Sequence, residues 1–161
     1  MNDLKKSRPK PFKTARAALE NEMVVSMGRL LSDHAVQMSA LVREHGLTLV
    51  HHNVLRILRG AGGDGLPSGT VAERMITKEP DITRLLDRME KQKLIVRSRD
   101  QLDRRVVMTR ITDHGLKILS RLDGPLEALL HAQFGHVPTE KIEALLAMVQ
   151  DIRDRPVQKA G

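Results

Sequence analysis

The chain has 161 residues, which is enough for one sizeable domain and gives no reason to expect a second. It contains no cysteine, which excludes a disulfide framework, a thiol redox switch and a cysteine nucleophile. It also lacks an apolar run of about 18 residues, and no apolar segment follows the basic N-terminus. We therefore expect neither a transmembrane helix nor a secretory signal, and a cytoplasmic location.

The formal net charge of +7 is unevenly distributed. Residues 1–16 carry a net charge of +5 and residues 93–110 carry +4, so the rest of the chain sums to −2. A basic stripe on a mildly acidic body favours a polyanion as partner. The arginines fall on a predicted hairpin, not on an amphipathic helix with bulky apolar anchors, so nucleic acid is favoured over a membrane surface.

The N-terminal part predicts a basic arm followed by a long helix. Residues 1–16 have the composition of a disordered arm. We expect a dimerisation helix within 17–46, roughly Leu19–Glu44. Its apolar stripe alternates steps of four and three with one lapse, close to a heptad seam. The stripe consists of Met23, Met27, Leu30, His34, Met38 and Leu41.

Residues 47–112 contain the elements of a compact DNA-binding unit. Thr48 can cap a helix that ends at Gly60, and a glycine-rich connector follows. Ser68 or Thr70 then opens a short helix, with Glu73 completing a capping box if Thr70 is the cap.

A second short helix is predicted over Lys78–Lys91, with Thr77 as its cap. Its apolar residues recur at the spacing of a single helix face. These residues are Ile82, Leu85, Leu86 and Met89. A hairpin follows, with strands over 94–99 and 106–111 and an arginine-rich tip over 100–105.

The C-terminal part, residues 113–155, predicts further dimerisation helices. Thr112 or Asp113 caps the first, and Gly124 with Pro125 should kink or break it. Pro138 and Thr139 open the last helix, whose apolar face we expect to pack on the N-terminal helix and on a second copy of the chain. Residues 156–161 form a disordered tail.

An amphipathic helix directly before an arginine-tipped hairpin is typical of a winged helix-turn-helix. The helix fits a DNA major groove and the arginine tip suits a minor groove. The fold class is therefore mainly α (α+β). The candidate DNA-binding residues are Ser68, Thr70, Lys78, Pro80, Asp81, Thr83, Arg84, Arg88, Asp103, Arg104 and Arg105. Among them Asp103 repels phosphate, so its expected task is to hold the turn or a neighbouring arginine in shape.

Three segments resemble the MarR family (multiple antibiotic resistance regulators). Asp103-Arg104-Arg105, followed by Ile111-Thr112 and Gly115, is similar to that family's wing pattern D-x-R-x5-[LI]-T-x-x-G. The segments Val71–Met75 and Thr83–Glu90 resemble its scaffold and recognition helices. The resemblance spans roughly Leu19 to Ile152. Lys93 departs from the pattern, because the family usually has glycine there, so the end of the recognition helix should differ slightly.

The resemblance implies a homodimer that binds a pseudo-palindromic double-stranded DNA operator, as a repressor relieved by a small, often aromatic, ligand. It implies a ligand cleft between the dimer helices and the winged unit, for which Met27, His34, His51 and Arg56 are candidate lining residues. By the family pattern, Arg105 is the matched wing arginine.

Other functions remain as alternatives. A sequence-indifferent architectural DNA binder would share the same basic surface, and seven histidines leave a metal-responsive regulator open, although none are paired at i, i+4. Gly60–Gly65 matches G-x-G-x-x-G but follows a helical pattern, so we expect a connector and no cofactor. No nucleophile elbow, metalloprotease motif or P-loop occurs, so we expect no catalytic residues and no enzyme.

Overall fold

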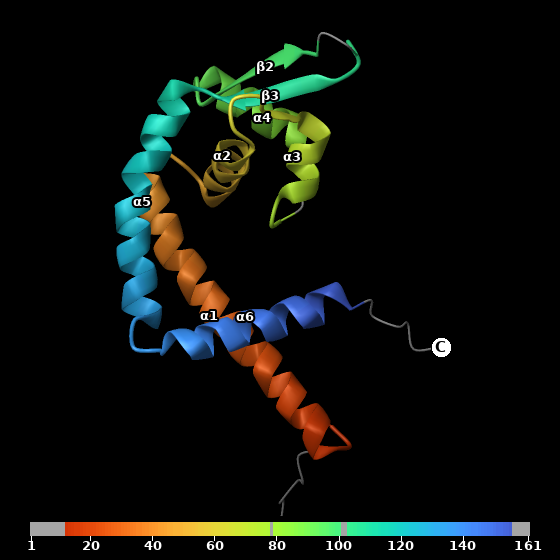
Figure 1. Ribbon diagram of the computed structural model, residues 1–161, viewed down its shortest axis with the longest axis vertical. Helices are drawn as coiled ribbons and strands as arrows, with labels where there is room; N and C mark the ends of the chain where they lie inside the picture. The colour runs from red at the N-terminus through yellow and green to blue at the C-terminus, as the bar shows by residue number, and fades with distance from the viewer. Residues whose placement is uncertain (1–11, 78, 101–102, 156–161) are drawn as a thin grey trace, which may run out of the picture.

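The computed structural model describes residues 12–77, 79–100 and 103–155, and most of the predicted arm and tail lie outside these ranges. Helices dominate, and a small sheet carries the wing at one end of the long helix α5, while α6 lies at its other end (Figure 1). The elements are α1 (Ala15–Glu44), α2 (Leu49–Ala61), β1 (Leu66–Pro67), α3 (Ser68–Arg74), α4 (Ile82–Lys91), β2 (Ile95–Arg99), β3 (Val107–Ile111), α5 (Asp113–Phe134) and α6 (Thr139–Asp154).

Threonine caps three of the helices. The side chains of Thr14, Thr48 and Thr112 each accept a hydrogen bond from a backbone amide in the first turn of the following helix. The prediction for Thr48 is confirmed, and Thr112, not Asp113, caps α5. Because Thr14 starts α1 at Ala15, the predicted disordered arm over 1–16 is wrong at its last two residues.

The two short helices begin elsewhere than predicted. Helix α3 starts at Ser68 with Pro67 as its cap residue, so Thr70 lies inside the helix and the predicted capping box is wrong. Helix α4 starts at Ile82, and Asp81 caps it by accepting a hydrogen bond from the Arg84 amide at 3.0 Å. Thr77 is therefore not the cap, because Pro80 disfavours a helical conformation in the residue before it.

The sheet has the order β1-β3-β2 and is antiparallel throughout. Strands β2 and β3 are the predicted hairpin, with Ile95 opposite Ile111. The two-residue strand β1 is too short for an alternating pattern and was not predicted. Gly65 leads into it at φ +72, and a Cβ there would lie 2.3 Å from the Thr109 carbonyl oxygen. The glycine-rich connector thus ends at a residue that must be glycine to approach the sheet.

Helix α4 ends in a Schellman motif that has lysine in the usual glycine position. Lys93 has φ +58, its amide donates to the Glu90 carbonyl at 2.8 Å, and the Leu94 amide donates to the Met89 carbonyl at 3.0 Å. Met89 and Leu94 are both buried. The expectation of an altered helix end is therefore wrong: Lys93 adopts the left-handed conformation, and the buried pair beneath it holds the turn.

The core lies where α2 meets α3, α4, α5, the C-terminal end of α1 and the sheet. Its fully buried apolar side chains come from all the central helices, which ties the winged unit together. The side chains with at most 1% of their surface exposed are Val42, Val54, Leu55, Leu58, Val71, Leu85, Leu86, Met89, Leu119 and Leu122.

Helix α5 runs unbroken through Pro125, so of the kink or break predicted at Gly124–Pro125 the break is wrong. Leu122 on one side of the proline is buried, and Leu126 and Leu129 on the other side pack against the same core. This packing holds both halves in one helix despite the backbone hydrogen bond that proline cannot make.

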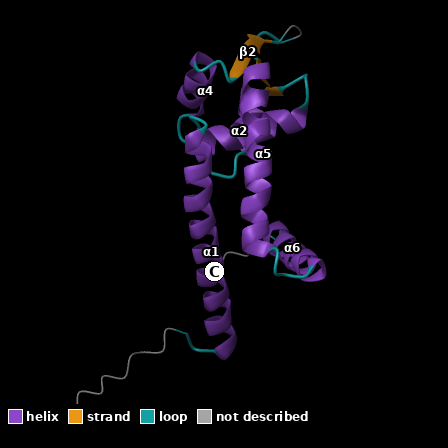
Figure 2. Ribbon diagram, turned by 90° about the vertical axis from the view of Figure 1, so that its left-hand side faces the viewer, coloured by secondary structure: helices purple, strands orange, loops and turns teal. Residues whose placement is uncertain are grey.

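The terminal helices expose much of their apolar surface. No residue of α6 is buried, and α1 and α6, which overlap in Figure 1, lie on opposite sides of α5 in Figure 2. The predicted packing of α6 on α1 therefore does not bury α6 within one chain. The exposed apolar residues of these helices include Leu19, Val24, Leu31, Val36, Leu145, Leu146, Met148 and Ile152. No helix in the described ranges combines the length and apolar character needed to cross a membrane.

The Gly115→Ala substitution tests a close approach between α5 and the end of α4. A Cβ at Gly115 would lie 2.3 Å from the Leu94 carbonyl oxygen, whereas one at Gly124, on the same helix, meets nothing within 4 Å. We expect Gly115→Ala to lower the free energy of unfolding by about 1–3 kcal/mol, as overpacking does. Gly124→Ala should leave it unchanged or raise it by about 0.5–1 kcal/mol.

Urea unfolding of both variants at one fixed protein concentration measures this difference. Equal stabilities of the two variants would contradict the required contact at Leu94.

Candidate nucleic-acid interface

Helix α4 presents a basic face opposite a buried one. Leu85, Leu86 and Met89 are buried, whereas Arg84 and Arg88 are exposed. Thr83, Lys91 and the turn residue Pro80 are also exposed. Lys78, the remaining predicted contact in this segment, lies outside the described residues.

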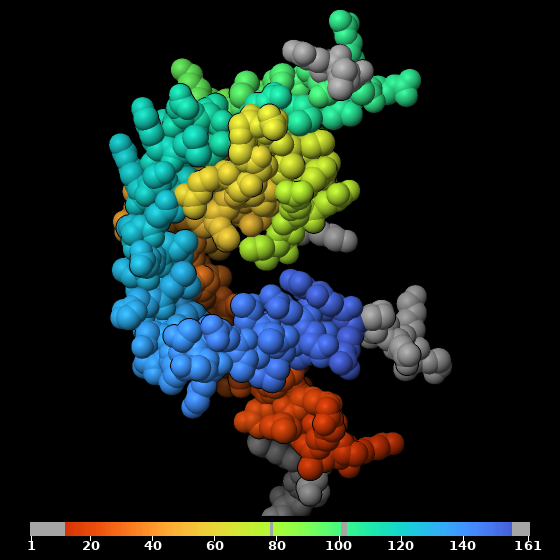
Figure 3. Space-filling view, viewed as in Figure 1, coloured from red at the N-terminus to blue at the C-terminus, as the bar shows by residue number. Residues whose placement is uncertain are grey.

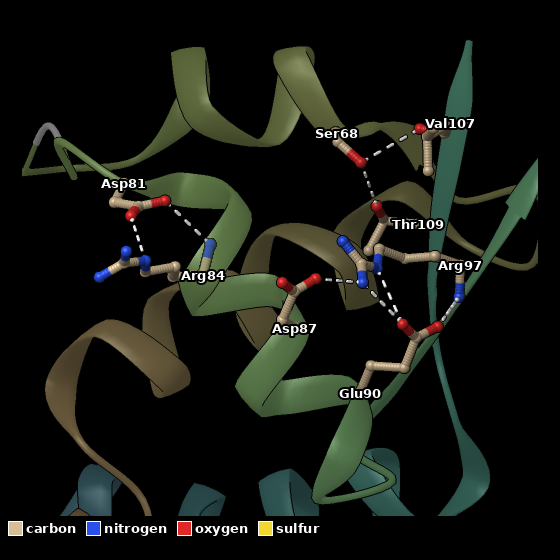
Figure 4. Close-up of polar contacts among 8 residues, drawn as sticks. All are labelled: Ser68, Asp81, Arg84, Asp87, Glu90, Arg97, Val107 and Thr109. Atoms are coloured by element: carbon tan, nitrogen blue, oxygen red, sulfur yellow. Dashed lines mark hydrogen bonds and ion pairs between the residues drawn. The ribbon is translucent and has the colours of Figure 1, made fainter. Parts of the chain in front are cut away.

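Asp81 serves α4 itself. Besides capping the helix, its carboxylate forms an ion pair with Arg84 Nε at 3.0 Å (Figure 4). The Arg84 side chain is 83% exposed. Its terminal guanidinium nitrogens make no contact with another described residue, so they remain available as a two-pronged donor. Asp81 was predicted as a DNA contact, and in this geometry it instead positions an arginine.

Arg97 on β2 is turned inward, toward α4. Its guanidinium contacts Asp87 at 2.5 Å and Glu90 at 2.7 Å, and its backbone amide donates to Glu90 at 2.8 Å (Figure 4). The hydrogen bond from Arg97 is the largest cause that holds the pKa of the Glu90 carboxyl below its ordinary value. Arg97 was counted in the basic stripe. Its charge is neutralised at the base of the wing, where it fixes the hairpin to α4.

The wing tip is held by backbone contacts to aspartate. Asp103 Oδ1 accepts the Arg105 amide at 2.9 Å, and the Asp103 amide donates to Asp100 Oδ1 at 3.0 Å. Asp103 thus shapes the turn, as its chemistry indicates. Arg104 and Arg105 are exposed, and neither side chain has an acidic partner among the described residues.

Ser68 joins α3 to the wing. Its hydroxyl lies 2.9 Å from Thr109 Oγ1 and donates to the Val107 carbonyl at 3.2 Å (Figure 4). Thr70 is half-buried in α3. The Ser68 hydroxyl, predicted as a phosphate contact, is therefore engaged in holding the sheet.

A cavity of about 650 Å³ opens between α1, α2, α5 and the turn that follows α3. The space-filling view is hollowed between the yellow-green winged part and the blue α6 (Figure 3). The walls are mostly apolar. The residues that line it are Leu31, His34, Ala35, Met38, Leu49, Val50, His52, Asn53, Arg56, Met75, Ile76, Thr77, Leu126 and Leu130.

Two of the four candidate ligand residues line this cavity, and two do not. His34 and Arg56 line it, and His34 Nδ1 is hydrogen-bonded to Gln133 at 2.8 Å. Met27 and His51 are absent from its walls, and His52 takes the place expected of His51. Neighbouring helix residues diverge by about 100°, so His51 lies on another side of α2 from His52.

Burial is the main cause that lowers the pKa of both His51 and His52. Nearby arginines add to it: Arg88 for His51, and Arg56 with Arg59 for His52. Both imidazoles are therefore neutral at pH 7. Within the described ranges, no group of three or more His, Cys, Asp and Glu side chains is placed to hold a metal ion.

Comparison with known sequences gives one family. The sequence model described as "MarR family" matches residues 45–106, which run from just before α2 to the tip of the wing and stop short of β3. The transcriptional regulator MhqR of Bacillus subtilis is 24% identical over 124 residues, which are 77% of this chain and 82% of MhqR. The repressor MdtR of the same organism is 31% identical over 97 residues, which are 60% of this chain and 61% of MdtR.

Solved structures give the same fold. A MarR transcription factor from Planctomyces limnophilus is 29% identical, with a TM-score of 0.62 over 81% of this chain and 94% of that one. The Staphylococcus aureus MepR–DNA complex has a TM-score of 0.70 at 20% identity, covering 80% and 94%. Rhodococcus jostii CouR bound to p-coumaroyl-CoA has a TM-score of 0.74 at 20% identity, covering 88% and 98%. The segment 45–106 therefore matches the MarR family, and the chain shares the winged helix-turn-helix fold of that family's solved transcriptional regulators.

Proposed function

We propose that this chain is a homodimeric repressor that binds a specific double-stranded DNA operator and releases it when a small ligand fills the cavity. One observation carries the DNA-binding part. The exposed arginines of α4 and of the wing tip lie on two elements that the Arg97 contacts to Asp87 and Glu90 join rigidly.

The two arginine groups suit two grooves. Arg84, held by Asp81, projects from the first turn of α4, where a recognition helix usually meets base edges. A guanidinium with two free terminal nitrogens can grip guanine O6 and N7. Arg104 and Arg105, at the end of a hairpin, suit the narrow, electronegative minor groove beside it. MepR, which shares the fold, has been solved as a DNA complex, which supports this use of the surface.

The exposed apolar faces of α1 and α6 support a two-fold dimer. A face with several residues more than 40% exposed, such as Leu145, Leu146 and Ile152, is costly in water and suits a partner of the same kind. Two-fold symmetry then places two α4 helices on half-sites about one helical turn apart, in a pseudo-palindromic operator.

The cavity supports a ligand with an apolar body and an acidic group. Its walls are mostly apolar, and Arg56, which lines it, has no acidic partner among the described residues. His52 beside it is buried and neutral, so it offers one donor and one acceptor. CouR has been solved with p-coumaroyl-CoA, which supports an aromatic body for the ligand.

A competition titration tests the DNA-binding part. We expect DNA from upstream of the protein's own gene to bind at least a hundredfold more tightly than unrelated duplex at one fixed salt concentration. Unrelated duplex that competes equally well would favour the sequence-indifferent architectural binder. Loss of binding after chelator treatment would instead favour the metal-responsive regulator.

In the same titration, Arg105→Ala should weaken operator binding by about 1–3 kcal/mol, because it removes a cation from the wing tip and leaves the turn bond to its backbone intact. Arg121→Ala, which removes the same charge from an exposed position on α5, is the matched control and should bind normally. Unchanged affinity of folded Arg105→Ala would contradict a DNA contact at the wing.

Leu145→Glu on α6 tests the dimer. A carboxylate in an apolar interface cannot be solvated, so we expect a monomer by sedimentation and loss of operator binding. Ala147→Glu adds the same charge on the opposite face of the helix and should remain dimeric. If wild-type protein sediments as a monomer, the proposed dimer is wrong.

A panel of aromatic carboxylates tests the ligand class. We expect at least one of them to lower operator affinity, and Arg56→Gln to require about tenfold or more of the same compound for equal release, since a hydrogen bond to a charged group is lost. Arg121→Gln is the control and should respond like the wild type. Equal responses of Arg56→Gln and wild type would remove Arg56 from the site.

A further inference from the structure

The turn between α3 and α4 is part of the cavity wall and also leads into α4. Met75, Ile76 and Thr77 form part of the cavity wall. Only a few residues later Asp81 caps α4 and Ile82 begins it. Four residues, 78–81, separate Thr77 from Ile82, so a displacement of the turn would act on the first turn of the helix that carries Arg84.

One side-chain hydrogen bond ties this turn to the core. The Ile76 amide donates to Asn53 Oδ1 at 3.1 Å. Asn53 lies on α2 between the buried residues His52 and Val54, so its backbone is fixed. Its side chain also lines the cavity, which places the hydrogen bond in the cavity wall.

Within the described residues, the other hydrogen bond at this end of the turn joins the Met75 amide to the Ala72 carbonyl at 3.4 Å. Met75 is buried, but the side chain of Ile76 is 81% exposed, an unusual position for a large apolar group beside a mostly apolar cavity. Covering Ile76 would remove apolar surface from water. A turn that closed over an occupant of the cavity would cover more of Ile76 than a turn that Asn53 holds in place.

We propose that Asn53 is a positioning residue for DNA binding: its side-chain amide holds the turn, and thereby α4, in the DNA-binding position, and an occupant of the cavity displaces the turn from it. The inference rests on the proposed function and adds a route of regulation within one subunit. The turn is in equilibrium between its DNA-binding position and a displaced position. A ligand shifts this equilibrium only as far as its affinities for the two positions differ. By linkage, bound operator DNA lowers the affinity for the ligand by the same factor as the ligand lowers the affinity for DNA.

Two substitutions at Asn53 separate the hydrogen bond from the packing. Asn53→Leu keeps the size and removes the acceptor, whereas Asn53→Asp keeps an oxygen acceptor for the Ile76 amide. We expect Asn53→Leu to weaken operator binding about fivefold for each subunit, hence about 25-fold for the dimer, and Asn53→Asp to stay within about threefold of the wild type.

Hydrogen exchange gives a readout that a merely structural role would not move. The Ile76 amide should exchange faster in Asn53→Leu than in the wild type or in Asn53→Asp, while amides in the core of α2 keep their protection. Asn53→Leu that is folded and dimeric, yet binds operator like the wild type or keeps the Ile76 amide protected, would overturn the proposal.

A filled cavity can be imitated without knowing the ligand. Ala35→Trp places a large side chain in the cavity from α1, whereas Ala128→Trp, at an exposed position of α5 outside the cavity wall, serves as the control. We expect Ala35→Trp to weaken operator binding at least fivefold and Ala128→Trp to leave it unchanged.

The double variant Ala35→Trp with Asn53→Leu decides whether the cavity acts through the turn. If it does, the losses of operator-binding free energy caused by the two substitutions are less than additive, because the hydrogen bond between Asn53 and the Ile76 amide is already absent in Asn53→Leu. Strictly additive losses would overturn the proposed coupling between the cavity and the turn. Wild-type protein that binds no duplex would instead refute the proposed function, and the exchange of the Ile76 amide would still decide whether Asn53 holds the turn.

Discussion

The basic surface of α4 and the wing depends on the junction at Leu94, where α4 ends, β2 begins and α5 starts. The carbonyl oxygen of Leu94 accepts hydrogen bonds from both the amide and the hydroxyl of Thr112, each at 3.1 Å. The same hydroxyl reaches the Lys93 carbonyl at 2.6 Å and caps α5 through the Gly115 amide. Because Gly115 has no Cβ, α5 approaches this carbonyl closely. Three elements are thereby fixed at one point, which explains why threonine and glycine stand at this spacing in the wing pattern.

Features that depend on local sequence were predicted well. The helix faces, the hairpin and the Thr48 cap follow from spacing and cap chemistry within a few residues. The start of α4 was predicted wrongly, because Thr77 and Asp81 are both good caps and the restriction that Pro80 places on the residue before it decides for Asp81. Pro125 was misjudged because packing on both sides of it outweighs the lost hydrogen bond.

In the candidate site, local sequence likewise does not predict the surroundings of single residues. Arg97 and Arg104 look alike in sequence, but Asp87 and Glu90, on another element, neutralise one and leave the other exposed. His51 and His52 are adjacent, and only His52 reaches the cavity. Spacing along the chain indicates which residues share a helix face, but it does not say which face meets the cavity, because that depends on how distant helices pack.

The free energy of the Asn53 hydrogen bond limits how far movement of the turn alone can lower operator affinity. A hydrogen bond contributes about 1 kcal/mol net, so losing one in each subunit changes operator affinity by about 25-fold. Moving an equilibrium from almost fully bound to almost fully released needs about 5.5 kcal/mol. The two Asn53 hydrogen bonds of a dimer therefore supply less than half of the free energy that complete release from the operator requires. In the proposed dimer, the remainder would come from the exposed apolar faces of α1 and α6, since their packing would set the spacing of the two α4 helices. A ligand between α1 and the turn contacts both parts, so one molecule can draw on both contributions.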